Sequence, residues 1–543
     1  MLYYVAGPSR NSRPERVIYM KNRSLLILIL SALCLIVSNF IAPAIASGRG
    51  DFAPGVVLVK FNSTAAPNAI RRLARSHRLK QERHFRRIGV HRFRIPSGKN
   101  VRTVCHVLER NGIVYFAEPD YIRSARLIPN DPLFANQWDL NQIGMQAVWE
   151  IELGSPSVVT AIIDTGIDLD HPDLTSQLWI NSDELAGNNV DDDNNGYVDD
   201  VVGYDFAGDG PLPPPAREDP IPDDSIVGHG THVSGTVAGK QNNNQGITGI
   251  APGTKVMAVR ALGGALGTAY TSDLLDGIAY AVDNGAHVIN MSLGGTGKSL
   301  SEYLAVRDAW ENNVFIAAAA GNSGNTGNPI EYPAAFVFSM SVAANDINEN
   351  IASFSSHNSF VEIAAPGVQI MSTVPDGLYE QIGWSGTSMA TPHIAGVAAL
   401  LYSRFPGIAN WEVRAMLQNS AVDRGAVGWD EFFGFGRLSA SDACNASRPD
   451  PGTLQILTPP PGGVIRPGSI VSILWNPVTS AAGYQVRATL PSGAQRLIPV
   501  SSTHYTVDPR AVSPPAGNYN VTVEALSGGG AVLASDSVAF SIQ

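Results

Sequence analysis

The sequence predicts an α/β fold with a parallel sheet and helices on both of its faces, preceded by a small α+β region and followed by a β-sandwich. Three observations lead to this prediction. Between Asp131 and about Cys444, short apolar runs rich in β-formers alternate with helical stretches. Before this region, strands and helices alternate on a smaller scale. After residue 452, short alternating runs are separated by Pro and Gly turns.

The composition limits the number of domains and the classes of function that are possible. With 543 residues, 44% of them hydrophobic and 16% charged, the chain is globular and holds several domains. Its net charge of −11 argues against generic binding to nucleic-acid phosphates or to an anionic membrane. The charge is uneven, because residues 51–130 hold 16 Lys and Arg against 5 Asp and Glu. We expect this basic segment and the acidic remainder to attract each other before they are separated.

The N-terminus has the pattern of an export signal. Lys21 and Arg23 precede an apolar run over 25–42, and Ala44-Ile45-Ala46 has the small-x-small form of a signal-peptidase site. We therefore expect residues 1–46 to be a leader and signal peptide, and the protein to be extracellular, periplasmic or on the cell surface. An uncleaved anchor is the alternative, but we expect a mature form that does not span the membrane. Cys34 lies in this leader, so three cysteines allow no disulfide framework.

The basic segment, taken as residues 51–126, predicts a compact α+β unit of about 70 residues. Its expected elements in order are a strand over 54–61, a helix over 68–80, a strand over 90–95, a helix over 101–110 and a strand from 114 to 116. It holds no cluster of residues that could perform chemistry.

The central domain, residues 131–444, supplies the parallel strands. They are expected over 158–163, 255–259, 287–291, 314–319 and 337–342. In such sheets the functional site lies beyond the carboxyl ends of the strands. Polar or Gly-rich motifs follow these apolar runs, as this rule requires.

A linker over 445–452 separates this domain from residues 453–543. There we expect strands over 471–475, 484–489, 505–507, 519–526 and 538–542. The segments Leu474-Trp475-Asn476-Pro477, Gly483-Tyr484-Gln485-Val486 and Gly517-Asn518-Tyr519-Asn520-Val521 resemble those of a fibronectin type III module.

Three polar residues in the central domain stand at the ends of expected elements. Asp164 ends a strand, His229 lies between glycines at the start of a helix, and Ser388 opens the helix that runs through Leu401. A serine hydroxyl needs an imidazole to take its proton, and the imidazole needs a carboxylate to fix its tautomer. Asn322, in a Gly-Asn-Ser-Gly segment after a strand, is a natural amide donor to an oxyanion, together with the backbone N–H of Ser388.

The motifs around these residues resemble those of the subtilisin-like serine peptidases. They are Asp164-Thr-Gly-Ile-Asp168, His229-Gly-Thr-His-Val-Ser-Gly235 and Gly386-Thr-Ser-Met-Ala-Thr-Pro-His393, in that order. The resemblance covers about residues 131–444 and implies a secreted endopeptidase that cleaves peptide bonds through an Asp164, His229 and Ser388 triad and an acyl-enzyme. It also implies that Ser292, Leu293 and Gly294 pair with the substrate backbone. Ala319, Ala320 and Gly321 would line the pocket for the side chain before the scissile bond.

Other interpretations are weaker. Each of the three residues taken alone is more often a cap or turn residue than a catalyst. No Gly-x-Ser-x-Gly occurs, which disfavours an α/β-hydrolase. His232 is expected to be structural rather than the base. A binding or adhesion protein on a degenerate peptidase scaffold is the rival from another class, and a self-processing enzyme with one dedicated substrate is a milder one.

The segment before Asp131 resembles the propeptide of fervidolysin-like members of this family, which implies an intramolecular inhibitor and folding aid that is removed by self-processing between Ile122 and Asp131. We expect polypeptide substrates, no nucleic acid, no organic cofactor and a monomer.

Calcium is the expected ion. Asp191, Asp193 and Asn195, followed by Gly196, match the first half of an EF-hand-type loop, but Val202 stands where the bidentate Glu belongs. The remaining ligand is then expected from Asp199 or Asp200, and a solvated acidic loop is the alternative. By resemblance to the family, Asp173 and Asn243 are expected at a second, strong calcium site.

Overall fold

The computed structural model describes residues 52–121, 128–208, 218–507 and 514–543. The chain divides into two compact units, one ending at Ala125 and one beginning at Arg126. The leader expected over residues 1–46 lies outside the described residues, and so does much of the expected cleavage region. Within the described ranges, every helix is too short or too polar to cross a bilayer.

The first unit is a four-stranded antiparallel sheet in the order β2-β3-β1-β4. Its elements are β1 (Phe52–Phe61), α2 (Pro67–Ser76), β2 (Lys80–Phe85), β3 (Val90–Arg94), α3 (Val101–Glu109) and β4 (Val114–Tyr121). Val57, Phe93 and Leu108 lie in its core. The prediction of a helix over 68–80 is wrong at its end, because residues 80–85 form a strand. This strand has no apolar alternation and is held by pairing with β3.

The second unit contains a seven-stranded sheet in which every neighbouring pair is parallel, as predicted, in the order β11-β10-β9-β8-β5-β7-β6. Its strands are β5 (Val159–Asp164), β6 (Gly203–Asp205), β7 (Lys255–Arg260), β8 (Val288–Met291), β9 (Phe315–Ala319), β10 (Met340–Asn345) and β11 (Val361–Pro366). A small hairpin of β12 (Thr373–Val374) and β13 (Leu378–Tyr379) stands apart from it.

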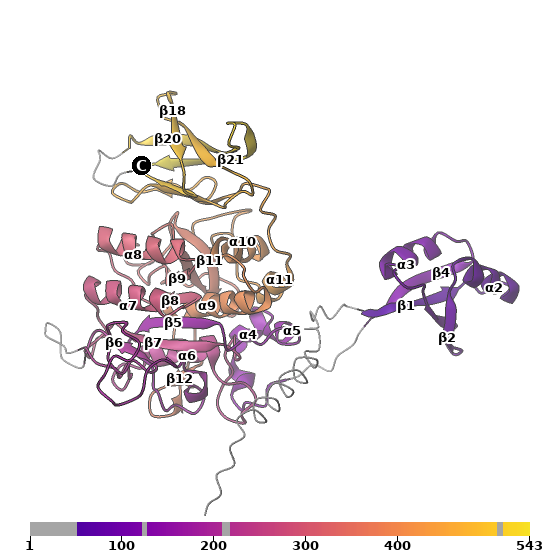
Figure 1. Ribbon diagram of the computed structural model, residues 1–543, viewed down its shortest axis with the longest axis horizontal. Coiled ribbons are helices and arrows are strands. Elements are labelled where there is room, and N and C mark those ends of the chain that lie inside the picture. Colours follow the sequence, from indigo (N-terminus) through magenta and orange to yellow (C-terminus); the bar gives the residue numbers. More distant parts are fainter. Residues whose placement is uncertain (1–51, 122–127, 209–217, 508–513) are drawn as a thin grey trace, which may run out of the picture. The chain divides into compact units, whose positions relative to one another are not determined.

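The helices of this unit lie on both faces of the sheet (Figure 1). They are α4 (Trp138–Gln142), α5 (Met145–Val148), α6 (His229–Ala238), α7 (Thr271–Asp283), α8 (Leu300–Glu311), α9 (Thr387–Arg404), α10 (Asn410–Ser420) and α11 (Ala440–Asn445), with short 3₁₀ turns at Phe134–Asn136 and Thr175–Gln177. Successive strand residues enter different cores, since Ile162 packs with α6 and α9 whereas Ala161 and Ile163 pack with α7 and α8. Both faces of β5 are therefore buried.

The expected strand over 337–342 is displaced. Residues 336 to 339 form turns, in which Ser339 donates its backbone N–H to Phe336 O at 3.1 Å, and β10 begins only at Met340. The apolar run thus covers a buried turn and the start of a buried strand. The pattern of hydrophobic residues does not show where the turn ends and the strand begins. Two strands of this sheet were not predicted, the three-residue β6 and β11, whose buried Glu362 pairs with Arg414 of α10.

The order of the strands places a topological switch at β5. This strand comes first along the chain, yet it lies between β7 on one side and β8 on the other. Ligands of open α/β sheets bind where the strand order reverses, beyond the carboxyl ends. Asp164 is the carboxyl-terminal residue of β5 and lies at this position.

Beyond the linker, the described residues form two further sheets, in the orders β14-β16-β19 and β15-β21-β20-β17-β18. Their strands are β14 (Ile456–Thr458), β15 (Val464–Ile465), β16 (Ser472–Trp475), β17 (Gly483–Thr489), β18 (Gln495–Val500), β19 (His504–Thr506), β20 (Gly517–Leu526) and β21 (Val532–Ile542). All five expected runs are strands. The apolar residues between the sheets, Trp475 and Val523 among them, form a core of their own.

This β-rich region packs directly on the α/β domain. Leu457, Ile470 and Leu474 belong to the same buried cluster as residues of α8 and β9. The hydroxyls of Tyr303 and Thr506 lie 2.6 Å apart. The two regions therefore share apolar surface in addition to the linker.

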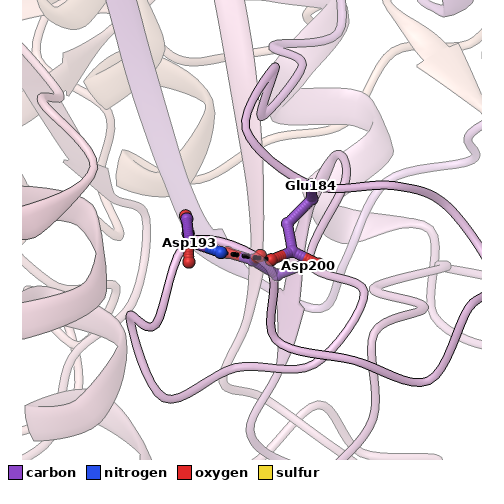
Figure 2. A group of neighbouring side chains, drawn as sticks. All are labelled: Glu184, Asp193 and Asp200. Atoms are coloured by element: carbon purple, nitrogen blue, oxygen red, sulfur yellow. Dashed lines mark hydrogen bonds between the residues drawn. The ribbon is translucent and has the colours of Figure 1, made fainter.

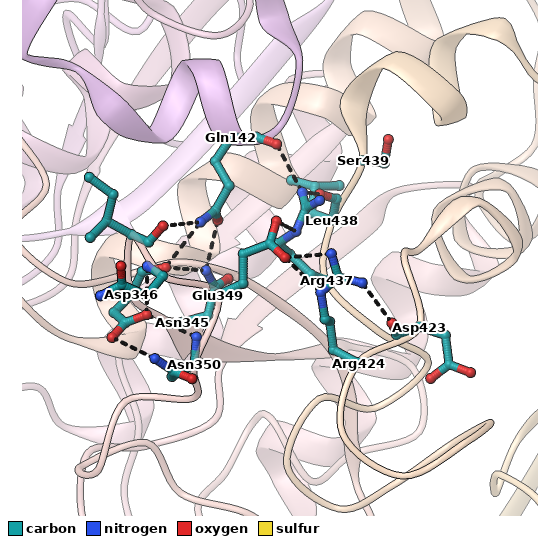
Figure 3. Close-up of polar contacts among 12 residues, drawn as sticks. Gln142, Asn345, Asp346, Glu349, Asn350, Asp423, Arg424, Arg437, Leu438 and Ser439 are labelled. Atoms are coloured by element: carbon teal, nitrogen blue, oxygen red, sulfur yellow. Dashed lines mark hydrogen bonds and ion pairs between the residues drawn. The ribbon is translucent and has the colours of Figure 1, made fainter.

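A polar network fastens the loop after β10 to the segment that precedes α11 (Figure 3). Glu349, in the loop after β10, forms ion pairs with Arg424 and with Arg437, the latter at 3.1 Å. Arg437 also donates to the backbone carbonyl of Gln142 at 2.9 Å, which reaches α4. Three segments that are distant in the sequence are joined here.

Candidate active site

Asp164 and His229 form the shortest polar contact among the expected catalytic groups. The Asp164 side chain is fully buried, and its Oδ1 lies 2.7 Å from Nδ1 of His229, the first residue of α6. Oδ1 also accepts the backbone N–H of Thr165 at 2.8 Å. When Nδ1 of a neutral imidazole donates to the carboxylate, Nε2 is left to accept a proton. About a quarter of the His229 side chain, 23%, remains exposed.

The charges around His229 favour its protonated form. Burial lowers the pKa of His229, but the charge of Asp164, its hydrogen bond and the charge of Asp224 outweigh burial and leave the pKa raised. Asp224 accepts the backbone N–H groups of Gly228 and Thr231, at 2.9 and 3.1 Å, and is thereby fixed beside α6. The site therefore stabilises an imidazolium ion, as a general base requires.

Ser388 lies in the first turn of α9. Its hydroxyl donates to the carbonyl oxygen of Ser292 at 2.9 Å, and the Ser292 hydroxyl donates to the carbonyl oxygen of Ser388 at 2.8 Å. The serine hydroxyl is thus bonded to the strand end after β8 rather than to His229. Catalytic hydrogen bonds are often loose without substrate, so the hydroxyl must turn toward the imidazole before reaction.

Trp384 links the segment before Ser388 to the first turn of α6. Its ring is stacked at 4.8 Å from the His232 ring and at 6.4 Å from the His229 ring. His232 is fully buried, its Nε2 lies 3.0 Å from the carbonyl oxygen of Ile370, and burial lowers its pKa to about 3. It is therefore a neutral ring that supports the site, which agrees with the expectation that it is structural.

Asn322 is exposed and lies next to the start of α9. Its Oδ1 accepts both the backbone N–H and the hydroxyl of Thr387, at 2.8 and 3.0 Å. With the oxygen engaged, the amide NH₂ group is left as a free donor. A Cβ on Gly386 would lie 3.5 Å from this nitrogen, which places the donor beside the turn into α9.

The residues expected to bind substrate flank Ser388 on two sides. Ser292, Leu293 and Gly294 follow β8, while Ala319 ends β9 and is followed by Ala320 and Gly321. The backbone N–H of Gly321 donates to the Thr387 hydroxyl at 3.2 Å. Both segments therefore contact the first turn of α9, one through Ser292 and the other through Gly321.

An acidic cluster forms in the loop after Asn181 (Figure 2). Carboxylate oxygens of Glu184, Asp193 and Asp200 all lie within 4.8 Å of one another. Burial raises the pKa of Asp200, although hydrogen bonds from Tyr280, Asn195 and Asn181 oppose this. An all-oxygen set of this kind fits a hard divalent cation.

The other expected ligands of this loop have different partners. Asp191 accepts the backbone N–H groups of Asn195 and Gly196, at 3.1 and 2.9 Å. Asp199 accepts those of Asn188 and Asn189, at 3.0 and 2.9 Å, so its carboxylate does not join the cluster. Asn195 donates from Nδ2 to Asp193 and Asp200. Of the two alternatives for the remaining ligand, Asp200 lies in the cluster and Asp199 does not, and Glu184 joins the cluster from outside the motif.

The second expected ion site brings together Asp173, Asn243 and an unexpected residue, Asp131. Asn243 donates to Asp173 at 2.5 Å, and Asp173 also accepts the backbone N–H of Ile247 at 3.0 Å. Asp131 accepts the N–H groups of Asn242 and Asn243, at 3.0 and 3.2 Å, and the neighbouring charge of Asp173 adds to the burial that raises its pKa. Two buried carboxylates thus face one Asn-rich loop.

Sequence reasoning missed Glu184 and Asp131 for the same reason. Each lies outside the motif whose residues it joins, Glu184 seven residues before Asp191 and Asp131 more than 100 residues before Asn242. Neither residue stands in a motif that distinguishes it from an ordinary loop carboxylate.

The comparisons with known proteins identify two regions of the chain. The model of the subtilase family of peptidases matches residues 155–436, and that of the fervidolysin N-terminal prodomain matches residues 39–120. Neither match includes residues 453–543, whose resemblance to a fibronectin type III module stays a prediction.

Individual relatives cover much of the chain. Thermitase of Thermoactinomyces vulgaris is 37% identical over 58% of this chain and 98% of its own length. The thermophilic serine proteinase of Bacillus sp. strain AK1 is 35% identical over 65% of this chain and 78% of its own. Fervidolysin of Fervidobacterium pennivorans is 32% identical over 76% of this chain and 58% of its own. The chain belongs to the subtilase family and is a serine endopeptidase with an N-terminal prodomain.

Proposed function

We propose that the protein is a secreted, calcium-stabilised endopeptidase that acts through Asp164, His229 and Ser388 and is made as a self-processed zymogen. His229 takes the proton of the Ser388 hydroxyl through Nε2 while the serine oxygen attacks the peptide carbonyl carbon. The imidazolium then protonates the leaving amine, and an acyl-enzyme remains. Water, deprotonated by the same ring, releases the acid and restores the serine.

The observation that carries this proposal is the 2.7 Å contact between Asp164 and His229 at the switch point of the sheet. The buried carboxylate fixes the Nδ1–H tautomer and stabilises the imidazolium formed in each step. Ser388, in the first turn of α9, also has the favourable end of the helix dipole beside its oxygen.

Asn322 is proposed to hold the oxyanion. Because Thr387 engages the amide oxygen, the side chain cannot rotate without losing two hydrogen bonds. Its NH₂ group is therefore preorganised, and such donors act mainly on charge that develops in the transition state. The backbone N–H of Ser388 would be the second donor.

The prodomain is proposed to inhibit the enzyme until it is cut. Residues 51–130 carry an excess of 11 positive charges, against a strongly acidic remainder of the chain. Opposite charges favour docking and raise the rate of association. Among its described residues the unit has one cysteine, the free and buried Cys105, so its fold rests on its small apolar core, and the charge attraction would favour the docked complex.

Calcium is proposed at two places. Glu184, Asp193 and Asp200 would hold one ion, and Asp131, Asp173 and Asn243 the other. Carboxylate and amide oxygens are the ligands that Ca²⁺ prefers, and bound Ca²⁺ would offset the repulsion between these carboxylates. The role of the ion is structural. No step of catalysis needs it.

Secretion is proposed from the basic and apolar leader pattern over residues 21–46. One relative is described as an extracellular serine protease, the halolysin-like protease Nep of Natrialba magadii, which is 36% identical over 64% of this chain.

The test is covalent labelling with an organofluorophosphate followed by peptide mapping. We expect the label on Ser388, because the reaction needs an activated hydroxyl and an oxyanion site. Ser388→Ala should remove labelling, turnover and self-processing, and should leave a folded precursor. A non-catalytic binding protein would take up no label and would show the same precursor processing in both forms.

A further inference from the structure

A carboxylate lies at the place where the substrate side chain next to the cleaved bond would enter. Two segments contact the first turn of α9 beside the reactive hydroxyl, residues 292–295 and 319–322, and we call the position between them, where an acyl group on Ser388 would place its side chain, the slot. One segment is held to Ser388 by the reciprocal Ser292 hydrogen bonds, and the other to Thr387 by Gly321 and Asn322. An acyl group on Ser388 would direct its side chain between them.

The Glu331 carboxylate lies beside both of these segments. A Cβ built on Gly321 would collide with Oε1 of Glu331, and a Cβ built on Gly294 would lie 3.1 Å from its Oε2. The carboxylate is therefore next to one glycine from each segment. Gly321 has a φ of 110°, in the region that favours glycine, so the conformation and the close approach both depend on a missing side chain.

The backbone holds Glu331 in this position. Tyr332, the next residue, exchanges two hydrogen bonds with Gly295, of 3.0 and 2.8 Å, and so continues the segment that contains Gly294. Tyr332 is itself buried against Phe336, with ring centroids 4.9 Å apart. The carboxylate is therefore fixed by a buried neighbour and a backbone bridge rather than by bonds of its own.

The Glu331 carboxylate has no partner among the described residues. No Lys, Arg or His in the described ranges forms an ion pair with it, and no hydrogen bond to its side chain occurs there. The side chain is half-buried, and burial alone raises the pKa of its carboxyl group. An unpaired carboxylate in such a place is costly unless a ligand supplies the cation.

We propose that Glu331 selects a cationic side chain, that of Arg or Lys, at the substrate residue immediately before the scissile bond. This inference rests on the proposed function, because it takes Ser388 as the nucleophile. A guanidinium or ammonium in the slot would form a charge-assisted hydrogen bond with the carboxylate in a partly desolvated site. An apolar side chain would bury the carboxylate without pairing it, and an acidic one would be repelled.

The test compares peptide substrates that differ only at that residue, which is arginine in one and its neutral isostere citrulline in the other. For the wild-type enzyme we expect kcat/KM at least about tenfold higher for the arginine peptide, as a hydrogen bond between charged groups should give. For Glu331→Gln this ratio should fall to about one, while the citrulline peptide is cleaved as before. Glu150→Gln, which removes an exposed carboxylate, is the matched control and should keep the wild-type ratio.

Titration with an organofluorophosphate normalises each rate to the active sites that are present, so a partly folded variant is not mistaken for a selective one. Equal cleavage of the two peptides by the wild-type enzyme would overturn the proposal without need of any variant, and the labelled serine would show that the proposed function still stands. A ratio that survives in Glu331→Gln would overturn it as well. Absence of both label and cleavage would overturn the proposed function and this inference together.

Discussion

Replacing Asp164 by Asn removes the charge and keeps the size of the side chain, so it measures what the buried carboxylate contributes to catalysis. The charge centres of Asp164 and a protonated His229 would lie ~4 Å apart, given the 2.7 Å contact between Oδ1 and Nδ1. At an effective dielectric constant of about 20, their attraction is about 4 kcal/mol. Since each 1.36 kcal/mol is a factor of ten in rate, kcat should fall about 10³-fold.

The same substitution should move the pH dependence. The neutral imidazole is the base, so kcat/KM rises as the pH passes upward through the pKa of His229, which Asp164 holds above its ordinary value. Without Asp164, burial dominates and the pKa falls, so the acid limb of the profile should move to lower pH. The assay is the pH profile of peptide hydrolysis, normalised to folded protein.

Asp170→Asn is the matched control, because this exposed carboxylate lies six residues further along the same loop. It should leave both kcat and the acid limb unchanged. A loss of less than tenfold in Asp164→Asn, or an acid limb that moves to higher pH, would refute the assignment of Asp164 as the partner of the base.

Three further predictions concern stability. Removing calcium with EDTA should lower the melting temperature of the wild-type protein, and Glu184→Gln should reduce that difference; an identical melt with and without EDTA would count against both ion sites. Glu349→Gln breaks the ion pairs with Arg424 and Arg437 (Figure 3) and should lower the free energy of unfolding, measured by urea titration, by about 1–2 kcal/mol. An unchanged free energy of unfolding would show that solvent screens these ion pairs. Ending the chain at residue 452 should expose the apolar surface that Leu457, Ile470 and Leu474 cover, and should lower the melting temperature by several degrees. An unchanged melting temperature would mean that only the linker joins the β-rich region to the α/β domain.

The sequence was most informative where a residue and its context are contiguous. Asp164, His229 and Ser388 each lie in a short motif at the end of an apolar run, and the fold places all three at element ends. The parallel sheet followed from the same runs, because strands buried on both faces are continuously apolar.

What the sequence could not predict depends on contacts between distant segments. The strand over 80–85 has five polar residues before Phe85 and is held by pairing with β3. Glu184 lies seven residues before Asp191, where the EF-hand-type motif begins. Glu331 follows an ordinary loop, and only its position against Gly294 and Gly321 distinguishes it from a surface residue.

The packing of the β-rich region on the α/β domain also could not be predicted from the composition. The Pro- and Gly-containing linker suggested an independent module, yet Ile470 and Leu474 share a core with the helix-covered sheet. Such a contact depends on the complementary shapes of the two surfaces, and local sequence patterns do not predict those shapes.

The most direct measurement is the mass of the enzyme trapped during turnover. An activated ester substrate, quenched with acid in the first milliseconds, should leave a stoichiometric acyl group that peptide mapping places on the Ser388 oxygen, and His229→Ala should abolish the burst. An acyl group on another residue, or peptide hydrolysis that continues in Ser388→Ala, would contradict the account.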